Sequence, residues 1–593
     1  MCGIYGIVGK KNVINDTLIG ISNLEYRGYD SAGIAYFNQK TINVIKEVGD
    51  ISNLKSVIED INPKSNIAIA HTRWATHGNP SKENAHPFVS CNGDFCLVHN
   101  GIIENFEELK PLTDRNFSSS TDSEVILKLI EKYYDGDILT TIHKVCSMLK
   151  GSYALAILSK YDLDKIYVVK NTSPCVVSKA KKDTRVCSDI NSVGNVEYSY
   201  ILNNGDIAVL TKNNITVYNK DLQIYTPEKV YCDINYDNNK GSFSHYMRKE
   251  IYDIPKTILD TCSVYKDRTT LNNIFKNLDL SKFSSILIIG CGTAYHAGFI
   301  GKKLLELSLD IPIKCEIASE FLYSNTYLDK STLAFFVSQS GETADTISAL
   351  KIAKSKGATT IAISNVKNST ITFESDYNLY TYAEKEIAVA STKAYIAQIS
   401  LFYILSSYLN QKTLLDSYDD TLSNIEKIGE DIDIPLLEKL AIEISHDIYQ
   451  EKDIYMIGRD FDYITALESS LKLKEISYIH SEAYPAGELK HGTISLIENG
   501  TFVFAFLTQD ALKSKTLNNV MEVISRGGKI ITISNNTINI DSVYKNILLP
   551  NVNEIYLPIY SAVFMQLVAY HTSLAKNLNP DKPRALAKSV TVE

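Results

Sequence analysis

The second half of the sequence repeats itself, and this duplication restricts its fold more than any other feature. Two pairs of matching segments show the repeat: ILIIGCGTAYHAG (286–298) with IYMIGRDFDYITA (454–466), and KGATTIAISN (356–365) with GGKIITISN (527–535). Both pairs are separated by nearly the same number of residues, a coincidence that chance rarely produces. The period is far too long for a solenoid, so the repeat predicts two copies of one domain.

Apolar strand-like runs alternate with helical patterns inside each copy. SSILIIG, TLAFFVSQSG and ATTIAISN are strand runs, and a longer helical pattern follows each of the first two. Alternation of this kind is typical of βαβ units, which form a parallel sheet with helices on both faces. We therefore expect doubly wound α/β domains over residues 280–415 and 445–575, joined by a helical connector.

The first half has a different pattern, with many short strand-like runs and few helices. Its strand runs include Ile67–Ala70, Phe95–Val98, Tyr153–Leu158 and Lys165–Val169, and Ser123–Tyr133 has a helical pattern. This mixture predicts an α+β domain over residues 2–230. Residues 231–245 are polar and rich in asparagine, which indicates a linker. Residues 581–593 form a tail.

Composition excludes several classes of protein. The net charge is −9 and no basic run stands out, which argues against a nucleic-acid partner and an anionic membrane surface. No apolar stretch approaches the roughly 18 residues of a membrane helix, and the N-terminus lacks the features of a signal peptide. The 10 cysteines include no CxxC pair, so we expect no zinc site or disulfide framework, and a cytoplasmic protein.

Cys2 directly follows the initiator methionine. Removal of Met1 would leave a thiol beside a free α-amino group, whose pKa of about 7.7–8 lets it act as a base. One residue would then supply nucleophile and base together. Taken alone, however, Cys2 is more simply a small residue at the start of a strand.

Five sequence blocks around Cys2 decide between these interpretations. The blocks are CGIYGIVG (2–9), LEYRGYDSAG (24–33), HTRWATHG (71–78), HNG (99–101) and STDSE (120–124). Together and in this order, they resemble class II glutamine amidotransferases, which have an N-terminal nucleophile. The resemblance implies that Cys2 attacks glutamine. It also implies that Asn100 and Gly101 form the oxyanion hole through an amide side chain and a backbone N–H.

The same resemblance implies how the glutamine itself is bound. Arg73 would hold its α-carboxylate and Asp122 its α-ammonium, while His77 and the loop around Trp74 complete the pocket. The matching tryptophan in this family gates the passage of ammonia. Taken singly, Arg73 could be a surface residue and Asp122 the N-cap of the following helix.

The segment VSQSGET (337–343) lies where a strand pattern ends and a helix pattern begins. Ser338, Ser340 and Thr343 place hydroxyl groups around a helix N-terminus, and Gly341 allows a ligand close to the backbone. Such a site binds phosphate without arginine, in the crevice where α/β sheets bind ligands. The alternative is a well-capped helix with Gln339 exposed.

Further blocks resemble the sugar isomerase (SIS) domains of the glutamine–fructose-6-phosphate aminotransferase family. These blocks are GCGTAYHAG (290–298), EIAVASTKAY (386–395), ALESSLKLKEISYIHSEAYPAGELKHG (466–492) and LAKSVTVE (586–593). The resemblance implies a sugar-phosphate site formed by Thr293, Ser338, Gln339, Ser340, Thr343, Val389, Ser391 and Ala587. Ala294 departs from the family, which usually has serine there. One substrate hydrogen bond, worth about 1 kcal/mol, would be lost.

Glu468, Lys472 and Glu475 are spaced to share one face of a helix. An exposed salt-bridged face is the commonest use of this spacing. The resemblance instead implies that Glu475 moves a proton between C1 and C2 of the sugar, while Glu468 and Lys472 tune it.

His491 and Lys588 complete the set of residues that the resemblance implies. His491 matches the residue that opens the sugar ring from the neighbouring subunit, which makes a homodimer or a larger oligomer the expected state. Lys588 matches the lysine that forms a Schiff base with the opened sugar. Alone, the first could be a structural histidine and the second a solvated tail residue.

The implied substrates are L-glutamine and fructose 6-phosphate, with no metal or organic cofactor. The implied products are L-glutamate and glucosamine 6-phosphate, with ammonia passing between the two sites. Two alternatives are another class II amidotransferase, such as one acting on phosphoribosyl pyrophosphate, and a sugar-phosphate sensor that has lost activity. The duplicated second half argues against the first, and the intact Cys2, Asn100, Glu475 and Lys588 argue against the second.

Overall fold

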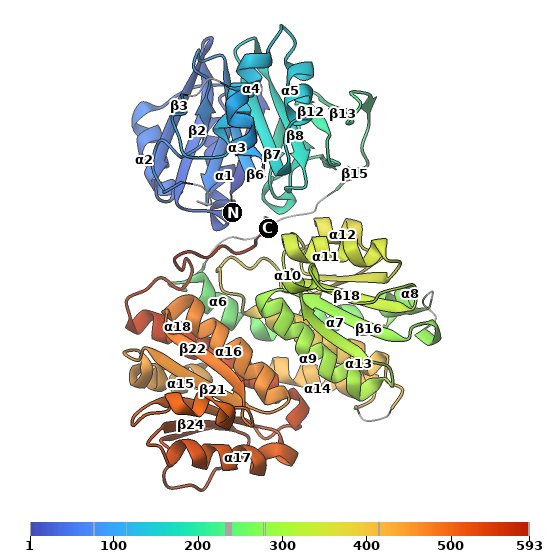
Figure 1. The fold of residues 1–593 in the computed structure, drawn as a ribbon, viewed down its shortest axis with the longest axis vertical. Helices are drawn as coiled ribbons and strands as arrows, with labels where there is room; N and C mark the ends of the chain where they lie inside the picture. Colours follow the sequence, from blue (N-terminus) through green and yellow to red (C-terminus); the bar gives the residue numbers. More distant parts are fainter. Residues whose placement is uncertain are drawn as a thin grey trace. The chain divides into compact units, whose positions relative to one another are not determined.

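The computed structural model describes residues 2–74, 78–113, 116–231, 240–276, 278, 280–412 and 415–590. The chain forms two compact units, Met1–Tyr236 with Ser589–Glu593 and Asp237–Lys588. Figure 1 shows the elements of each unit with their labels. The predicted linker lies partly outside the described residues, as do His77 and the end of the tail.

The first unit contains two antiparallel sheets. Within the described residues, the first sheet has eight strands: β15 (Lys229–Val230), β11 (Tyr198–Ile201), β9 (Val176–Lys179), β10 (Asp183–Cys187), β1 (Gly3–Gly9), β4 (Ile67–Arg73), β2 (Ser31–Asn38) and β3 (Thr41–Val48). The second sheet, counted over the same residues, has seven: β14 (Ile224–Tyr225), β13 (Ile215–Tyr218), β12 (Ile207–Leu210), β8 (Asp162–Asn171), β7 (Gly151–Ser159), β6 (Phe95–Ile103) and β5 (Phe88–Val89). The four strand runs predicted in this half are confirmed.

Helices cover the outer faces of both sheets. They are α1 (Ile14–Ser22), α2 (Ile51–Ile61), α3 (Phe106–Leu109), α4 (Glu124–Tyr133) and α5 (Ile138–Cys146). One apolar core lies between the sheets, where Ile4 of β1 packs in the same cluster as Val98 of β6. Two further cores join α1 and α2 to the first sheet and α4 and α5 to the second. The layers are therefore helix, sheet, sheet, helix, which confirms the α+β prediction.

The second unit contains two parallel sheets of identical topology. Over the described residues, the first sheet has five strands: β17 (Ile313–Ile317), β16 (Ser285–Gly290), β18 (Thr332–Ser338), β19 (Thr359–Ser364) and β20 (Tyr377–Tyr380). The second sheet repeats this order: β22 (His480–Pro485), β21 (Asp453–Gly458), β23 (Phe502–Leu507), β24 (Lys529–Ser534) and β25 (Lys545–Leu548). The duplication read from the sequence is therefore a duplication of a doubly wound domain.

Alternation of side chains explains why both faces of these sheets are covered. In β16, Ile286 and Ile288 belong to one core, while Leu287 and Ile289 belong to another. Successive residues of a strand point to opposite faces, so an uninterrupted apolar run needs a cover on each side. The covers are α9 (Gly292–Ser308), α10 (Ala318–Phe321), α11 (Ala344–Ser355), α12 (Thr370–Glu374) and α13 (Lys393–Tyr408), and in the second copy α16 (Phe461–Ser477), α17 (Asp510–Ile524) and α18 (Leu557–Ala575).

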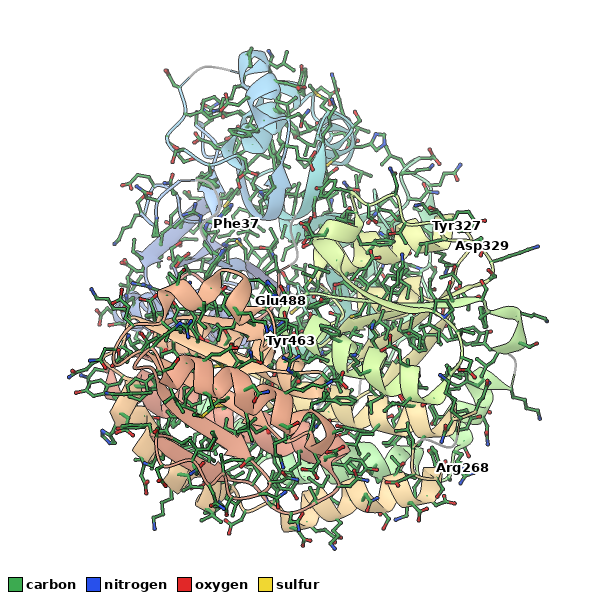
Figure 2. The ribbon with its side chains drawn as sticks, turned by 60° about the horizontal axis from the view of Figure 1, so that its bottom comes forward. Phe37, Arg268, Tyr327, Asp329, Tyr463 and Glu488 are labelled. Atoms are coloured by element: carbon green, nitrogen blue, oxygen red, sulfur yellow. The ribbon has the colours of Figure 1, made fainter. Side chains whose placement is uncertain are left out.

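The two copies share one continuous apolar core. Residues of α9 and α13 belong to the same cluster as residues of α16 and α18, and α16 and α18 run side by side in Figure 1. The remaining helices of this unit are α6 (Tyr246–Tyr252), α7 (Ile254–Tyr265), α8 (Thr269–Phe275), α14 (Tyr418–Asp431) and α15 (Ile434–Ile448). The predicted helical connector is α14 and α15. Arg268, labelled in Figure 2, ties α14 to the α7–α8 turn through Asp419 at 2.7 Å.

Candidate active sites

Cys2 lies at the entrance to β1, a strand paired with both β4 and β10. Its Sγ accepts a hydrogen bond from the N–H of Trp74 at 3.3 Å. Burial raises the pKa of the Cys2 thiol above its usual range, opposed in part by this N–H and by the charge of Arg73. A nucleophile in this setting needs a base beside it. Met1, whose removal would expose the amino group of Cys2, lies outside the described residues.

Asn100 and Gly101 lie on β6, beside the start of β1. The Asn100 side-chain amide donates to the carbonyl oxygen of Cys2 at 2.9 Å and to Ser188 Oγ at 2.8 Å. Ser188 Oγ also accepts from the N–H of Ile4 at 2.8 Å, which fixes the amide relative to β1. Gly101 has φ +131°, and a Cβ there would lie 1.8 Å from the Ser152 carbonyl oxygen. Glycine is therefore required at this position.

Arg73 and Asp122 are both buried near Cys2. Arg73 donates to the carbonyl oxygen of Gly78 at 3.1 Å, and Asp122 accepts from the N–H of Ile103 at 2.7 Å. Asp122 is not the N-cap of α4, because Ser123 occupies that position. Burial therefore excludes the surface role for Arg73, and the position of Ser123 excludes the helix-capping role for Asp122.

Trp74 follows Arg73 directly and packs against Tyr29. Its ring meets the ring of Tyr29 edge-on, with centroids 5.8 Å apart. His77, which the resemblance places in the same loop, lies outside the described residues. The structure therefore brings together every predicted glutamine-site residue that it describes.

The loop 338–343 leads from β18 into α11. Ser338 Oγ accepts from the N–H of Gly341 at 3.0 Å and lies 3.0 Å from Thr343 Oγ1. Gly341 has φ +68°, and a Cβ there would lie 2.0 Å from Ser369 Oγ. Thr343 is the N-cap of α11, so the predicted helix N-terminus is confirmed. Hydroxyls and helical N–H groups therefore converge as an anion would require.

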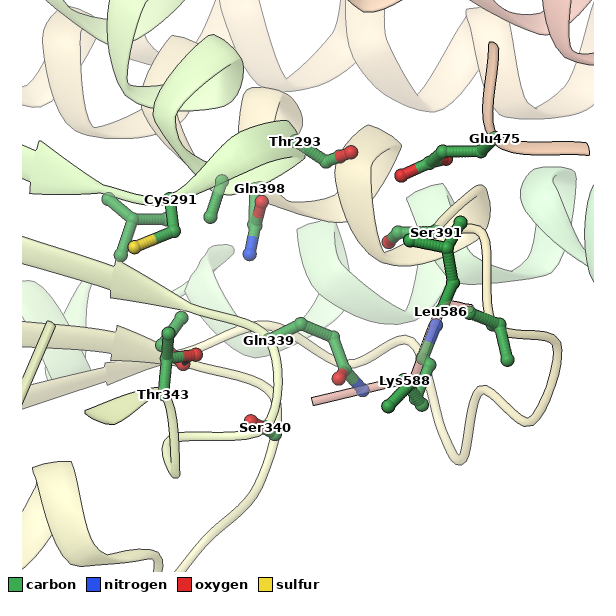
Figure 3. A pocket seen from close by; sticks show the side chains of 15 residues that line it. Cys291, Thr293, Gln339, Ser340, Thr343, Ser391, Gln398, Glu475, Leu586 and Lys588 are labelled. Carbon is green, nitrogen blue, oxygen red and sulfur yellow. Dashed lines mark hydrogen bonds between the residues drawn. The ribbon is translucent and has the colours of Figure 1, made fainter. Parts of the chain in front are cut away.

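One pocket of about 150 Å³ contains this loop and the predicted sugar residues. Its predicted lining residues are Thr293, Ser338, Gln339, Ser340, Thr343, Val389, Ser391, Glu475, Ala587 and Lys588, and it also contains Ala294. Figure 3 shows Ser340 and Thr343 on one side and Glu475, Ser391 and Lys588 on the other. The hydroxyls of the loop thus face the ionisable groups across one cavity.

Glu475 belongs to a chain of ionic contacts along α16. Lys472 Nζ lies 2.5 Å from Glu475 Oε2 and 3.5 Å from Glu468 Oε1. Glu468 in turn accepts from Thr293 Oγ1 at 3.1 Å and lies 2.7 Å from His296 Nδ1. The side chains of Lys472 and Glu468 are each only 1% exposed, so the solvated salt-bridge interpretation is wrong. Burial lowers the pKa of Lys472, but the two carboxylates outweigh it and the pKa is raised.

Lys588 is buried in the pocket and contacts Glu386. The Glu386 carboxylate also accepts from Ser391 Oγ at 2.9 Å and from the N–H of Thr392 at 2.8 Å. The tail leading to Lys588 is anchored by Asp581, which accepts from the N–H of Met247 at 2.8 Å. The lysine is therefore an ordered side chain, rather than the solvated tail residue that its position suggested.

His491 is exposed at the end of a 3₁₀ turn, Leu489–His491, and does not line the pocket of its own chain. Sequence reasoning missed three kinds of residue: the lining residues Cys291, Val337, Gln398 and Leu586, the Asn100 partner Ser188, and Glu386. Glu386 opens the EIAVASTKAY block, and its position there was the available signal.

In the second copy, the turn that corresponds to the loop 338–343 is occupied by a side chain of the protein itself. The corresponding turn leads from β23 into α17, where Glu554 Oε2 accepts from the N–H of Asp510 at 2.5 Å. Thr508, at the position of Ser338, donates to Asp462 at 2.5 Å. A carboxylate already occupies this helix N-terminus, where an anion would otherwise bind. The turn of the second copy is therefore closed by the protein's own carboxylate.

Among the described residues, no cluster of histidine, cysteine, aspartate or glutamate is arranged to hold a metal ion. No helix in the same part of the chain is long and apolar enough to cross a membrane.

Comparison with known proteins matches both halves of the chain. The glutamine amidotransferase domain family matches residues 58–207, and the SIS domain family matches residues 279–407 and 447–576. A solved C-terminal domain of glucosamine-fructose-6-phosphate aminotransferase from Francisella tularensis is 33% identical. Its similarity covers 58% of this chain and all of that chain, with a TM-score of 0.54. Tagatose-6-phosphate ketose/aldose isomerase from Escherichia coli, at 17% identity and a TM-score of 0.51, shares the fold over 60% of this chain and 99% of its own.

Curated relatives are similar over their whole length. A glutamine–fructose-6-phosphate aminotransferase (isomerizing) from Clostridium tetani is 43% identical over 612 aligned residues, covering 100% of both chains. One from Staphylococcus aureus is 40% identical over 607 aligned residues, again covering 100% of both. The chain therefore belongs to the glutamine–fructose-6-phosphate aminotransferase (isomerizing) family.

Proposed function

We propose that this protein converts L-glutamine and D-fructose 6-phosphate into L-glutamate and D-glucosamine 6-phosphate. The observation that carries the proposal is the meeting of Lys588 and Glu475 with the hydroxyl loop 338–343 in one pocket. A phosphate-binding loop, a buried amine and a carboxylate are the groups that amination and isomerisation of a phosphorylated ketose require. The names of the full-length relatives support the same reaction.

In the glutamine half, Cys2 is the nucleophile. Its thiol attacks the side-chain amide of glutamine and forms a thioester, and the α-amino group freed by loss of Met1 takes the thiol proton. Asn100 and Gly101 stabilise the oxyanion, which requires the Asn100 amide to exchange its contact with the Cys2 carbonyl oxygen for the substrate. Arg73 and Asp122 bind the two charged groups of the amino acid, with His77 and Trp74 closing the pocket.

In the sugar half, Ser338, Ser340 and Thr343 bind the phosphate and Lys588 forms a Schiff base with C2 of the opened sugar. The remaining pocket residues Thr293, Gln339, Val389, Ser391 and Ala587 position the substrate. Ammonia then displaces Lys588, and Glu475 moves a proton from C1 to C2 so that the ketose becomes an aldose. Glu468 and Lys472 hold Glu475 for that transfer.

Coupling of the halves is part of the proposal. Ammonia released at Cys2 passes to the sugar site instead of being lost to water, with Trp74 as the gate. The exposed position of His491, away from its own pocket, suits a ring-opening residue that acts on a neighbouring subunit, so we propose a homodimer. The scattered cysteines suit a reducing cytoplasm.

Incubation with glutamine and fructose 6-phosphate tests the proposal. The expected products are glutamate and glucosamine 6-phosphate in equal amounts. Glutamate without amino sugar would indicate another class II amidotransferase, and neither product would indicate a sugar-phosphate sensor. Cys2→Ala supplies the control, because it should abolish glutamine-dependent synthesis.

A further inference from the structure

Glu250 is a carboxylic acid buried on α6, outside the residues that line the sugar pocket. It is 2% exposed. Its Oε1 accepts hydrogen bonds from the N–H groups of Ile387 at 2.5 Å and Ala388 at 3.3 Å. Its Oε2 is buried and has no hydrogen-bond partner among the described residues. A charged oxygen left in this state is costly, so the environment favours the neutral acid.

Glu250 and Glu386 hold the same loop from opposite ends. Glu250 binds the two N–H groups that follow Glu386, and Glu386 binds the N–H groups of Thr392 at 2.8 Å and Ala394 at 3.1 Å. The loop between them carries Val389 and Ser391 into the sugar pocket. Two carboxyl groups therefore share one short piece of backbone, and one of them contacts Lys588.

The ammonium groups near Glu250 have other carboxylates as their direct partners. The ionisable groups that face Glu250 are Glu386, Lys588 and Lys393. Lys588 contacts Glu386, and Lys393 lies 3.4 Å from Asp253. Within the described residues Glu250 itself forms no ion pair, so its carboxyl lacks the direct contact with a cation that would favour ionisation.

The surroundings of the two carboxyls favour a proton on Glu250 rather than on Glu386. Burial, and then the negative charge of Glu386, raises the pKa of Glu250 to about 8. Burial acts the same way on Glu386, but the Lys588 ammonium and the donated hydrogen bonds outweigh it, so the pKa of Glu386 is lowered. The two carboxyls thus have separate states, one neutral and one ionised.

We propose that Glu250 is the neutral acid that keeps Lys588 reactive, and that Glu386 is the base that takes the lysine proton. The inference rests on the proposed Schiff-base role of Lys588. An ammonium proton passes to Glu386, and the free Nζ attacks C2, forming a C–N bond as the carbonyl π pair moves to oxygen. The C2 oxygen takes one proton from the attacking nitrogen and a second from Glu386, and it departs as water as the iminium forms.

Neutral Glu250 lowers the cost of the first of these steps in a buried site. With Glu250 protonated, proton transfer from Lys588 to Glu386 converts one ion pair into two neutral groups, and all three side chains are then neutral. With Glu250 ionised, the same transfer would leave an uncompensated negative charge, and the lysine would be held as ammonium. Glu250 acts through Glu386 and the loop, so it is a positioning residue rather than a catalytic one.

Glu250→Gln tests the inference, because glutamine resembles the neutral acid in shape and cannot ionise. Glu384→Gln is the matched control, since Glu384 is an exposed carboxylate two residues before Glu386. Initial rates of glucosamine 6-phosphate formation are measured from pH 6 to 10 for both variants, for Glu386→Gln and for the unmodified protein. Glutamine hydrolysis without sugar is recorded as a check on folding.

We expect the rate of the unmodified protein and of Glu384→Gln to fall above about pH 8. Glu250→Gln should retain most of the rate at pH 7, and its decline should begin at least one pH unit higher. An unchanged alkaline decline in Glu250→Gln would overturn the inference. So would a loss of activity at pH 7 as large as that of Glu386→Gln.

Thermal unfolding supplies an independent readout. The raised pKa means that the unfolded chain releases a proton that the folded chain keeps, so Glu250 destabilises the fold progressively as pH rises from 5 to 8. The melting temperature of the unmodified protein should therefore fall relative to Glu250→Gln over this range. A difference in melting temperature between the two proteins that does not change with pH would show that Glu250 is not neutral in the folded protein. If the unmodified protein makes no amino sugar at all, the proposed function fails instead, and this thermal comparison still decides the state of Glu250.

Discussion

The Nζ of Lys472 lies 2.5 Å from Oε2 of Glu475, and both residues belong to α16. The lysine side chain is 1% exposed and the glutamate side chain 21% exposed, so the pair spans the border between core and pocket. Glu468 holds the lysine from the other side at 3.5 Å. The lysine therefore fixes the carboxylate that borders the pocket in one orientation.

Glu475→Gln should abolish isomerisation while leaving the Schiff base intact. Glutamine has nearly the same shape but cannot take a proton, so product formation should fall by about 10²–10⁴-fold. Reduction with borohydride in the presence of fructose 6-phosphate should still trap a Lys588 adduct, detectable by mass spectrometry. A variant that makes glucosamine 6-phosphate at the normal rate would contradict the role of Glu475.

Lys472→Met should lower product formation because it leaves Glu468 buried without its cation and Glu475 unfixed. Lys474→Met is the matched control, since Lys474 is exposed on the same helix. We expect a loss of at least about tenfold in kcat for the first variant and little change for the second. Equal kinetics for the two variants would show that the buried contact does not matter.

Ala294→Ser should strengthen binding of fructose 6-phosphate. Ala294 lines the pocket at the start of α9, where a hydroxyl could reach the phosphate. One added hydrogen bond is worth about 1 kcal/mol, so KM for the sugar should fall roughly fivefold. KM for glutamine serves as the control and should not change. An unaltered KM for the sugar would mean that this position does not contact the phosphate.

Gly101→Ala should eliminate glutamine hydrolysis. A methyl group at this position would lie 1.8 Å from the Ser152 carbonyl oxygen, so β6 would have to move away from Asn100. Synthesis from free ammonia at high concentration should survive, because the sugar pocket belongs to the other unit. Retained glutaminase activity would contradict the assignment of Gly101 to the oxyanion hole.

Glu438→Gln should destabilise the second unit at neutral pH and much less in acid. Glu438 accepts two hydrogen bonds from Arg248, at 2.8 and 2.9 Å, and contacts His571 at 2.9 Å. Burial opposes these contacts, but they dominate and lower the pKa of Glu438 to about 2. A depressed pKa stabilises the fold above the unfolded value near 4.3, and this stabilisation is lost as pH falls toward 2.

Chemical denaturation at several pH values measures this effect. The loss in the free energy of unfolding should be at most about 2 kcal/mol at pH 7, after allowing for solvent near the pair. It should shrink steadily between pH 5 and pH 2. The control is Glu443→Gln, on the same helix as Glu438, which removes an exposed contact with Lys545 of β25. A loss for Glu438→Gln that does not change with pH would contradict the ionic explanation.

Local sequence patterns were sufficient to predict the fold. The apolar runs that became β16 and β18 are buried on both faces, which is why they lack alternation and read as parallel strands. The turn at Gly341 was recognisable because serine, glycine and threonine follow a strand directly and precede a helix. Each of these signals lies within a few neighbouring residues, so a single sequence is enough to recognise it.

Contacts between distant segments could not be predicted in this way. Glu250, Glu386 and Lys588 come together because α6, a loop and the tail meet, and nothing near Glu250 signals its partners. The burial of Lys472 was equally hidden, because the spacing of charges is the same on a solvated helix face. Ser188 meets Asn100 only because the two sheets of the first unit pack together.

Transfer of a labelled nitrogen tests the central claim most directly. The protein is incubated with fructose 6-phosphate and glutamine carrying ¹⁵N in its side-chain amide, in a buffer containing unlabelled ammonium. Mass spectrometry of the product should show ¹⁵N in nearly all of the glucosamine 6-phosphate, and Cys2→Ala or Lys588→Arg should make none from glutamine. Glutamate formed without labelled amino sugar, or a product that takes its nitrogen from the buffer, would contradict the account.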